Sequence, residues 1–365
     1  MTILYDEQQQ AIAEEAARIL AARTSGEHLK TLLETSGAYD ETFWDTAREQ
    51  GWTGIGIPEE EGGIGLGLVE LGLIAEACGA VAAGAPFLNS GFGAAQAILA
   101  YGDATARGAW LPRLAVGDAI GAIAFAEGAD MLPASPSLRC TNGRLTGSKP
   151  AVAGGSAADI AIVLASGEHG PVLALVALDQ AGVARTVFDT FDNSRCAADL
   201  AFENAEATVL DSGDALAAAL HILSLQAVVT AHEQVGGAAR MMTTARDYAL
   251  TRTAFGQVIG GFQSVKHRIA EDYVLVELAR ANAVQAAASH GSPAFARNAA
   301  AARLSATEAY DTVSRDATQV HGGIGVTWES DLHLHQRRAR SLAIEQGPMP
   351  FWEDILVDLL AGEDA

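Results

Sequence analysis

The sequence predicts an α+β protein in three parts: an N-terminal helical domain, a small middle β-barrel and a C-terminal helical bundle. Apolar residues recur with helical spacing up to about residue 118, short alternating runs bounded by turn formers follow, and helical spacing returns near residue 211. Helices, then strands, then long helices indicate separate layers and not a βαβ sheet. We therefore expect domains at 1–118, 119–210 and 211–365.

The N-terminal part begins with helical spacing over 6–23. The segment from Ala77 to Gly102 carries no charge, but Gly, Pro and Asn residues interrupt it. A membrane helix needs about 20 mostly apolar residues in a row. We therefore expect two buried helices joined by a loop at 84–91, and no membrane partner.

The middle part contains Asn142-Gly143, a pair that tolerates positive φ and predicts a β-hairpin. In the C-terminal part, Ser292 and Pro293 fit the N-cap and first residue of a helix that ends near Gly322-Gly323. Helices are expected over 212–250, 262–289, from 292 to about 322, 329–343 and 350–361.

Composition excludes several functions. The net charge is −22, which disfavours duplex nucleic acid and anionic membranes, because phosphate binding needs clustered Lys and Arg. The three cysteines form no CxxC pair, and His333 and His335 are two apart, so we expect no metal site. The N-terminus lacks a basic region followed by an apolar core, and we expect a cytoplasmic protein. No strand–GxGxxG–helix unit or P-loop is present.

Two C-terminal segments could carry binding chemistry. Arg252 lies near a helix end, Phe255-Gly256 interrupts the helical pattern, and Gln263 begins the next helix. An arginine beside such a turn can bind phosphate. The alternative is a solvated arginine and a packed phenylalanine. Gly322-Gly323 lets another molecule approach the backbone closely, unless it is an ordinary helix C-cap.

Together these segments resemble the acyl-CoA dehydrogenase family. Its R-x-x-F-G-x-x-I-x-x-x-Q run is matched by Arg252, Phe255, Gly256, Ile259 and Gln263, and its Q-x-x-G-G run by Gln319, Gly322 and Gly323. The family's P-E-x-x-G-G-x-G loop is matched within 56–67. The resemblance spans nearly the whole chain. Within the family, the chain resembles a divergent bacterial branch that includes enzymes of steroid and side-chain degradation.

The resemblance implies an acyl-CoA dehydrogenase-like fold and an oxidoreductase that uses FAD. In the family FAD lies between subunits, and the equivalents of Arg252, Phe255, Gln319 and Gly322-Gly323 reach it from a neighbour. The resemblance implies that Gln263 binds the cofactor as well. A carboxylate takes the Cα proton of an acyl-CoA thioester while the Cβ hydride goes to flavin N5. Electron-transfer flavoprotein is the implied acceptor, and a homo- or hetero-oligomer (dimer or tetramer) the implied assembly.

The sequence departs from the family at the base. Gln346 stands where many members have the catalytic glutamate, and Gln226 stands where others carry it on the long helix. An amide cannot accept that proton. In the β-domain, "FAEGADM" and Ala151-Val152-Ala153 replace family segments that pack on the flavin.

Three carboxylates could replace the missing base: Glu345 by a one-residue slip, Glu233 two turns beyond Gln226, and Glu127 in the β-domain loop. The alternative roles are a solvated loop residue for Glu345, a helix-packing or interface residue for Glu233, and a strand-end charge for Glu127. We name Glu345 as the candidate base.

Two main hypotheses follow. The first is an FAD-dependent acyl-CoA dehydrogenase. The second is a catalytically silent subunit of a mixed oligomer, lacking the base and contributing cross-subunit FAD contacts. A flavin oxidase or nitroalkane-type enzyme on the same scaffold is a third.

Overall fold

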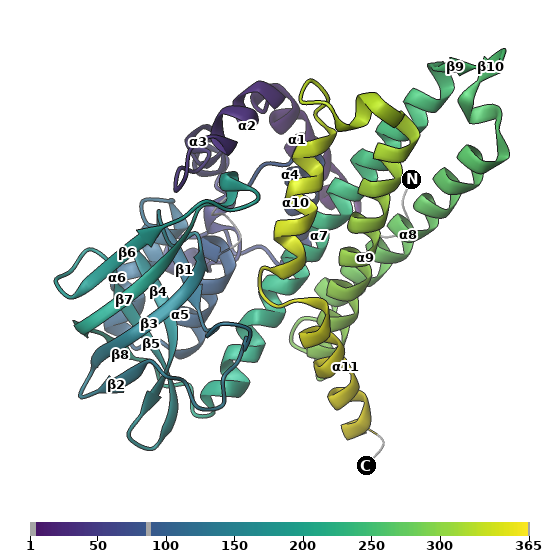
Figure 1. Ribbon diagram of the computed structural model, residues 1–365. Helices are drawn as coiled ribbons and strands as arrows, with labels where there is room; N and C mark the ends of the chain where they lie inside the picture. The colour runs from purple at the N-terminus through teal and green to yellow at the C-terminus, as the bar shows by residue number, and fades with distance from the viewer. Residues whose placement is uncertain (1–4, 85–88, 364–365) are drawn as a thin grey trace. The chain divides into compact units, whose positions relative to one another are not determined.

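A computed structural model describes residues 5–84 and 89–363 and confirms the predicted fold class (Figure 1). The chain forms two compact units. One comprises Met1–Lys30, Gly72–Ala83 and Ala227–Ala365, and the other comprises Thr31–Leu71 and Gly84–Gln226. The second unit contains a curled β-sheet, and the first is a helical bundle.

The sheet has eight strands in the order β6-β7-β3-β2-β4-β5-β8, with β1 pairing parallel to β4. The strands are β1 (Gly121–Ala124), β2 (Arg139–Thr141), β3 (Arg144–Ala153), β4 (Ile160–Gly167), β5 (Gly170–Ala177), β6 (Val183–Val187), β7 (Ala197–Glu206) and β8 (Thr208–Val209). The predicted hairpin joins β2 and β3, and Asn142 and Gly143 both have positive φ. Residues 160–165 of β4 are all buried, so this strand is the centre of the sheet core.

The helices of this unit are short. They are α3 (Glu41–Glu49), α5 (Ala95–Tyr101) and α6 (Ala104–Ala115), with the single turns η1 (Trp52–Gly54), η2 (Glu59–Glu61) and η4 (Asn193–Arg195) and the π-helical η3 (Asn89–Ala94). Asp40 and Asp103 cap α3 and α6 by accepting hydrogen bonds from Phe43 N–H and Ala106 N–H.

The helical bundle is built from long helices. They are α1 (Glu7–Arg23), α7 (Ala215–Thr251), α8 (Gln263–Ala288), α9 (Phe295–His321), α10 (Leu332–Ile344) and α11 (Met349–Glu363), with α2 (Gly26–Leu33) and α4 (Leu68–Ala80) contributing their bundle segments. A two-stranded hairpin, β9 (Thr253–Ala254) and β10 (Gln257–Val258), and the turn η5 (Ile259–Gly261) join α7 to α8; η6 (Gly322–Val326) follows α9. Figure 1 shows α8 and α9 running side by side.

The start of α9 differs from the prediction. The helix begins at Phe295 with Ala294 at the N-cap position. Ser292 N–H donates to Ser289 O, and Phe295 N–H donates to Ser292 O, so Ser292 and Pro293 belong to successive turns before the helix. Local capping chemistry predicted the helix correctly and its first residue two positions early.

Helices α4 and α7 touch through glycines. A Cβ on Gly79 would lie 1.8 Å from the carbonyl oxygen of Glu233, and one on Gly236 would lie 1.8 Å from that of Glu76. No larger residue fits at either position without moving a backbone. The two helices therefore approach more closely than side chains would allow.

Helix α7 is long and apolar enough to cross a membrane by length and composition, but 78% of its most apolar window is buried inside the structure. Burial on this scale is expected of a core helix in a soluble protein. The predicted helices on either side of the 84–91 loop are the end of α4 and η3–α5; residues 85–88 of that loop lie outside the described residues.

Candidate functional site

The loop between α10 and α11 holds Gln346, the amide that the resemblance places at the base position. Gln346 is 8% exposed and has φ of +54°. Its Oε1 accepts a hydrogen bond from the Thr230 hydroxyl on α7 at 3.0 Å, and its carbonyl oxygen accepts one from the indole N–H of Trp352 at 3.1 Å. Both ends of the residue are therefore fixed, and its side chain presents a neutral group.

A buried arginine donates hydrogen bonds to backbone carbonyl groups at the start of this loop. Arg303 on α9 is 1% exposed, and its Nη2 donates to the carbonyl oxygens of Leu342 and Glu345, the latter at 2.9 Å. Its Nη1 donates to Gln234 Oε1 at 2.7 Å and to the Thr307 hydroxyl at 2.6 Å. Burial lowers its pKa to about 10, which still leaves it charged at neutral pH. The guanidinium thus fixes the backbone on which Glu345 and Gln346 stand.

Glu233 is committed to an ion pair. It is 1% exposed, and its Oε1 accepts from Nη1 of Arg338, also 1% exposed, at 2.8 Å. The same guanidinium nitrogen donates to the carbonyl oxygen of Ala83 at 2.7 Å. A carboxylate held by a buried arginine is stabilised in its charged form and poorly suited to accept a proton.

In the sheet-containing unit, Glu127 is a structural residue. Its carboxylate accepts from the ammonium of buried Lys149 at 2.7 Å and from the backbone N–H groups of Ser137 and Leu138. Burial alone would raise its pKa, but these hydrogen bonds outweigh that effect and lower the pKa to about 2. Gln226, in the same unit, is fully buried.

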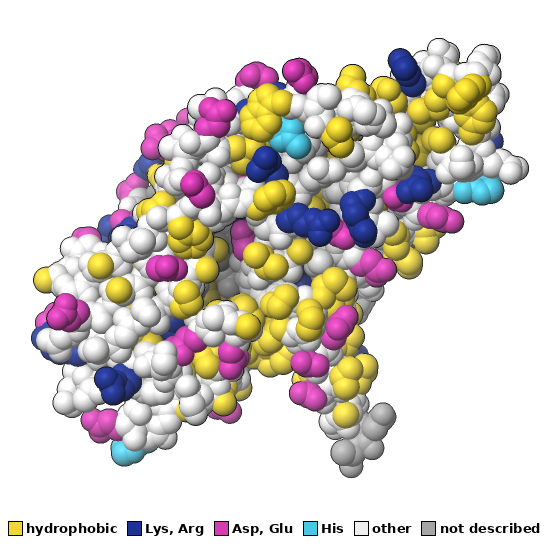
Figure 2. Space-filling model, viewed as in Figure 1, with side chains coloured by type: hydrophobic (Ala, Val, Ile, Leu, Met, Phe, Trp, Pro, Cys, Tyr) yellow, Lys and Arg dark blue, Asp and Glu magenta, His cyan; other side chains and the backbone are white. Residues whose placement is uncertain are grey.

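The other predicted residues lie at the far end of the bundle, in the β9–β10 hairpin. Phe255 is at its tip, 96% exposed, and has φ of +51°, with Gly256 at +82°. Figure 2 shows apolar side chains gathered over this hairpin, at the upper right. Its ring makes one edge-to-face contact, with Phe262 at a centroid distance of 6.3 Å, and is otherwise open to solvent. Arg252, also exposed, starts the hairpin, and Gln263 is the first residue of α8.

Gln319 and Gly322-Gly323 lie at the end of α9, all exposed. A Cβ on either glycine would meet no atom within 4 Å, and Gly322 has φ of +63°. Open space over two glycines leaves the backbone accessible to another molecule. The C-cap alternative holds as well, since Gly322 terminates the helix.

An aromatic stack brings these two segments together. The rings of Tyr248 on α7 and His321 on α9 are stacked with centroids 4.2 Å apart. Tyr248 lies one turn before Arg252, whose N–H donates to the Tyr248 carbonyl, and His321 directly precedes Gly322. We name the set Arg252, Phe255, Gln319, Gly322 and Gly323 the helix-end cluster. It combines a cation, an exposed ring, an amide and accessible backbone.

Sequence reasoning missed Arg303, Arg338 and the Tyr248–His321 stack. Arg303 left a signal, because it is a lone charge among alanines on the face of α9 that carries Ala299, Ala306 and Tyr310. A charged residue on a buried face is seldom tolerated without partners. The stack left none, since neither ring departs from its helix pattern. Among the described residues, no group of His, Cys, Asp and Glu side chains could hold a metal ion.

Comparisons with known proteins agree with this arrangement. Residues 6–118 match the family model described as "Acyl-CoA dehydrogenase, N-terminal domain", and residues 213–356 match "Acyl-CoA dehydrogenase, C-terminal domain". The chain is 32% identical to the acyl-CoA dehydrogenase IpdE2 of Mycobacterium tuberculosis over 92% of both chains. It is 28% identical to FadE27 of the same organism over 90% of both.

Solved structures give the same result. The Tcur3481–Tcur3483 steroid ACAD superposes with a TM-score of 0.89 at 27% identity, covering 98% of this chain and 99% of that one. The ChsE4–ChsE5 complex of Mycobacterium tuberculosis superposes with a TM-score of 0.88 at 26% identity, covering 99% of each chain. With both terminal domains matched and a relative above 30% identity over nearly its full length, the chain belongs to the acyl-CoA dehydrogenase family, oxidoreductases that act on acyl-CoA.

Proposed function

We propose that this chain takes part in FAD-dependent α,β-dehydrogenation of an acyl-CoA thioester as the subunit without the base in a mixed oligomer. The observation that carries the proposal is the state of the base positions. Gln346 is a buried amide whose oxygen already accepts from Thr230, and Gln226 is a buried amide. Glu233 is held by Arg338. In this proposal the Cα proton is taken by a carboxylate of another subunit.

The helix-end cluster fits FAD held mainly by a neighbour. Arg252 offers a planar cation for the pyrophosphate, and the open backbone at Gly322-Gly323 accepts close approach. Phe255 presents an exposed ring, in contact with Phe262 on one edge, that a bound dinucleotide would cover. When bound, FAD supplies the acceptor for the hydride that leaves Cβ. This chain's contribution is to bind and orient the dinucleotide.

The relatives support a mixed assembly and a bulky substrate. Two similar solved structures are named as pairs, Tcur3481–Tcur3483 and ChsE4–ChsE5, and the first is a steroid ACAD. We therefore propose a steroid-derived acyl group as the substrate class and electron-transfer flavoprotein as the electron acceptor. The acidic composition and buried α7 support a soluble assembly in the cytoplasm.

A second candidate is a self-sufficient dehydrogenase with Glu345 as the base. The observation that favours it is position: Glu345 directly precedes Gln346, and Arg303 fixes its carbonyl oxygen.

The test is to purify the chain alone and together with a co-expressed homologue encoded beside it. Flavin absorbance and acyl-CoA-dependent dye reduction are measured with butyryl-CoA and cyclohexanecarbonyl-CoA, and oxygen uptake is followed in parallel. We expect flavin and turnover only in the co-expressed preparation. Turnover by the chain alone contradicts the silent role, and rapid oxygen uptake in place of dye reduction would indicate an oxidase.

Two matched variants decide which residue matters. Glu345→Gln leaves turnover of the mixed oligomer unchanged if the partner supplies the base, and abolishes it if Glu345 does. Gln346→Glu keeps the acceptor for Thr230 and places a carboxylate at the family position. It should give the chain measurable turnover in its own half of the assembly.

A further inference from the structure

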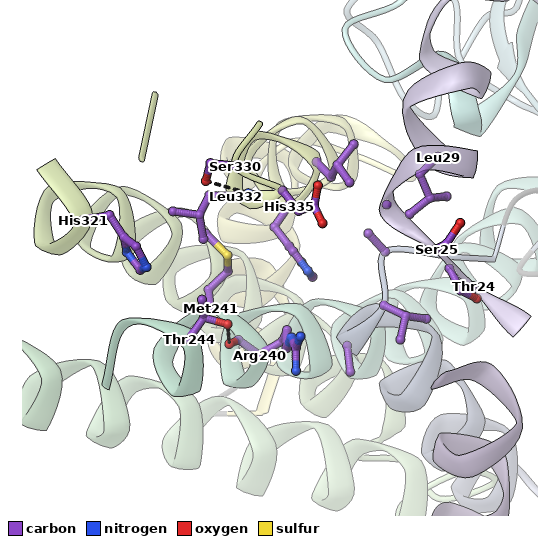
Figure 3. Close-up of a pocket in the computed structure, with 16 residues that line it drawn as sticks. Thr24, Ser25, Leu29, Arg240, Met241, Thr244, His321, Ser330, Leu332 and His335 are labelled. Carbon is purple, nitrogen blue, oxygen red and sulfur yellow. Dashed lines mark hydrogen bonds between the residues drawn. The ribbon is translucent and has the colours of Figure 1, made fainter. Parts of the chain in front are cut away.

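A cavity is formed by residues of the helical bundle, away from the base loop (Figure 3). Its volume is about 340 Å³, within the range of small-molecule sites. It is formed where the α1–α2 turn and the end of α4 meet α7 and the start of α10. Its lining residues are Thr24, Ser25, Gly26, Leu29, Ala80, Val81, Ala82, Arg240, Met241, Thr244, His321, Ser330, Asp331, Leu332, Leu334 and His335. We name it the Arg240 pocket.

The Arg240 pocket is separate from the base loop. Both lie along α7: Thr230 contacts Gln346, and Arg240 lies ten residues farther on, roughly 15 Å at the helical rise. Between them stands the buried Glu233–Arg338 pair. Neither residue of that pair, nor any residue of the base loop, lines the pocket.

One cation in the pocket has no anionic partner. Arg240 is exposed toward the cavity, and within residues 5–84 and 89–363 no carboxylate pairs with its guanidinium. The pocket's carboxylate, Asp331, is paired with the Lys30 ammonium at 2.9 Å. In a chain of net charge −22, an unpaired arginine facing a cavity creates a local site for an anion.

A buried histidine supplies a second polar contact. Figure 3 shows the His335 ring pointing into the pocket toward the helix that carries Arg240. Its Nδ1 lies 2.8 Å from the Tyr310 hydroxyl, which leaves Nε2 for the cavity. Burial, with the nearby charges of Arg338 and Arg240, lowers the His335 pKa to about 3. The ring is therefore neutral, and in the tautomer in which the Tyr310 hydroxyl donates to Nδ1, Nε2–H is a donor.

The hydroxyl groups add further donors. Ser25 Oγ accepts from the His28 N–H at 3.3 Å, and Ser330 Oγ accepts from the Leu332 N–H at 3.4 Å. Each hydroxyl hydrogen is thereby left to donate to a ligand. The remaining walls are mainly apolar, from Leu29, Val81, Met241, Leu332 and Leu334.

We propose that the Arg240 pocket binds a small organic carboxylate, with its carboxylate against Arg240 and Nε2 of His335 and its apolar body against the Leu29–Leu332 side. A single unpaired cation matches one negative charge. Inorganic phosphate shares the anionic oxygens but lacks the apolar body, and its second charge would face Asp331. The proposal does not rest on the proposed function, because binding here needs neither FAD nor a base, although His321 of the pocket also stacks on Tyr248 beside the helix-end cluster.

The test uses full-length chain and ligand-observed NMR titrations with hexanoate, its neutral isostere hexanamide, and inorganic phosphate. We expect hexanoate to bind at about 10 mM or below, and hexanamide and phosphate to bind at least about tenfold more weakly. Arg240→Gln should weaken hexanoate by at least about tenfold. The control is Arg246→Gln, an exposed arginine on the same helix that pairs with Asp247 and does not line the pocket.

Equal hexanoate affinity in Arg240→Gln and the parent chain would overturn the assignment. So would tighter binding of phosphate than of hexanoate, or no binding of hexanoate at all. A second variant, His335→Asn, keeps an N–H donor while shortening the side chain. If it folds with unchanged circular dichroism, a weaker hexanoate titration supports the placement of Nε2, and an unchanged titration contradicts it.

Discussion

The ring of Tyr248 on α7 stacks on the imidazole of His321 on α9, with centroids 4.2 Å and planes 24° apart. The imidazole Nδ1 lies 2.8 Å from the carbonyl oxygen of Ala317, one turn back on α9. The stack therefore ties the end of one helix to the end of another. It sets the spacing between Arg252 and Gly322, which are far apart in sequence and which we propose to contact the same dinucleotide.

Replacing Tyr248 tests this spacing. Tyr248→Leu keeps an apolar side chain but removes the stacked ring, and we expect a loss of about 1 kcal/mol in the free energy of unfolding. FAD content of the co-expressed assembly, measured by absorbance after gel filtration, should fall by more than this loss explains. Tyr248→Phe retains the ring and is the control. Equal FAD content in both variants would argue against a role for the stack.

At the hairpin tip we expect a substitution to lower FAD affinity without lowering the stability of the chain. Phe255 has φ of +51° and is 96% exposed, so Phe255→Gly removes backbone strain and loses only the edge-to-face contact with Phe262. We expect the free energy of unfolding to stay level or rise by about 1 kcal/mol, while FAD affinity of the assembly falls. Chemical denaturation and flavin titration measure the two effects. A less stable variant with unaltered FAD affinity would mean that the ring serves the fold.

The buried Glu233–Arg338 pair should behave as a unit. Glu233→Gln leaves a buried guanidinium uncompensated, and we expect a loss of about 3 to 5 kcal/mol. Arg338→Met combined with Glu233→Gln removes both charges and should recover part of that loss. The exposed Arg246–Asp247 pair is the control, because Arg246→Gln should cost no more than about 0.5 kcal/mol. Additive effects in the double variant would show that the two charges do not interact.

Asp272 should make stability depend on pH. Burial, followed by the charge of Asp316, raises its pKa from 3.8 to about 7. Between these values the folded chain keeps the proton and the unfolded chain has lost it, so the stabilising contribution is lost as pH rises toward 7. Asp272→Asn should therefore stabilise the chain by about 2 kcal/mol at pH 8 and by less at pH 5.

Urea denaturation of both proteins at the two pH values measures this difference. Asp354→Asn, at an exposed position on α11, is the matched control. A constant difference between Asp272→Asn and the parent chain across pH would contradict the assignment.

The order of elements could be predicted because periodicity and turn residues are local. The Asn142-Gly143 hairpin and the end of α9 at Gly322 follow from backbone preferences at single positions. The amides at 226 and 346 could be found by resemblance alone. Their burial, the Thr230 contact and the guanidinium of Arg303 beneath the loop depend on residues up to 116 positions apart, which no local pattern encodes. The same holds for the Arg240 pocket, whose walls come from five separate stretches of chain.

The glycine contact between α4 and α7 limits how the chain can be dissected. Gly79 and Gly236 let an early helix press its backbone against a late one. A C-terminal fragment that begins at α7 lacks α4, and the glycine-containing face of α7 that α4 covers would be exposed to solvent. We expect such a fragment to aggregate on expression, whereas co-expression with a peptide spanning 68–83 should restore part of its solubility.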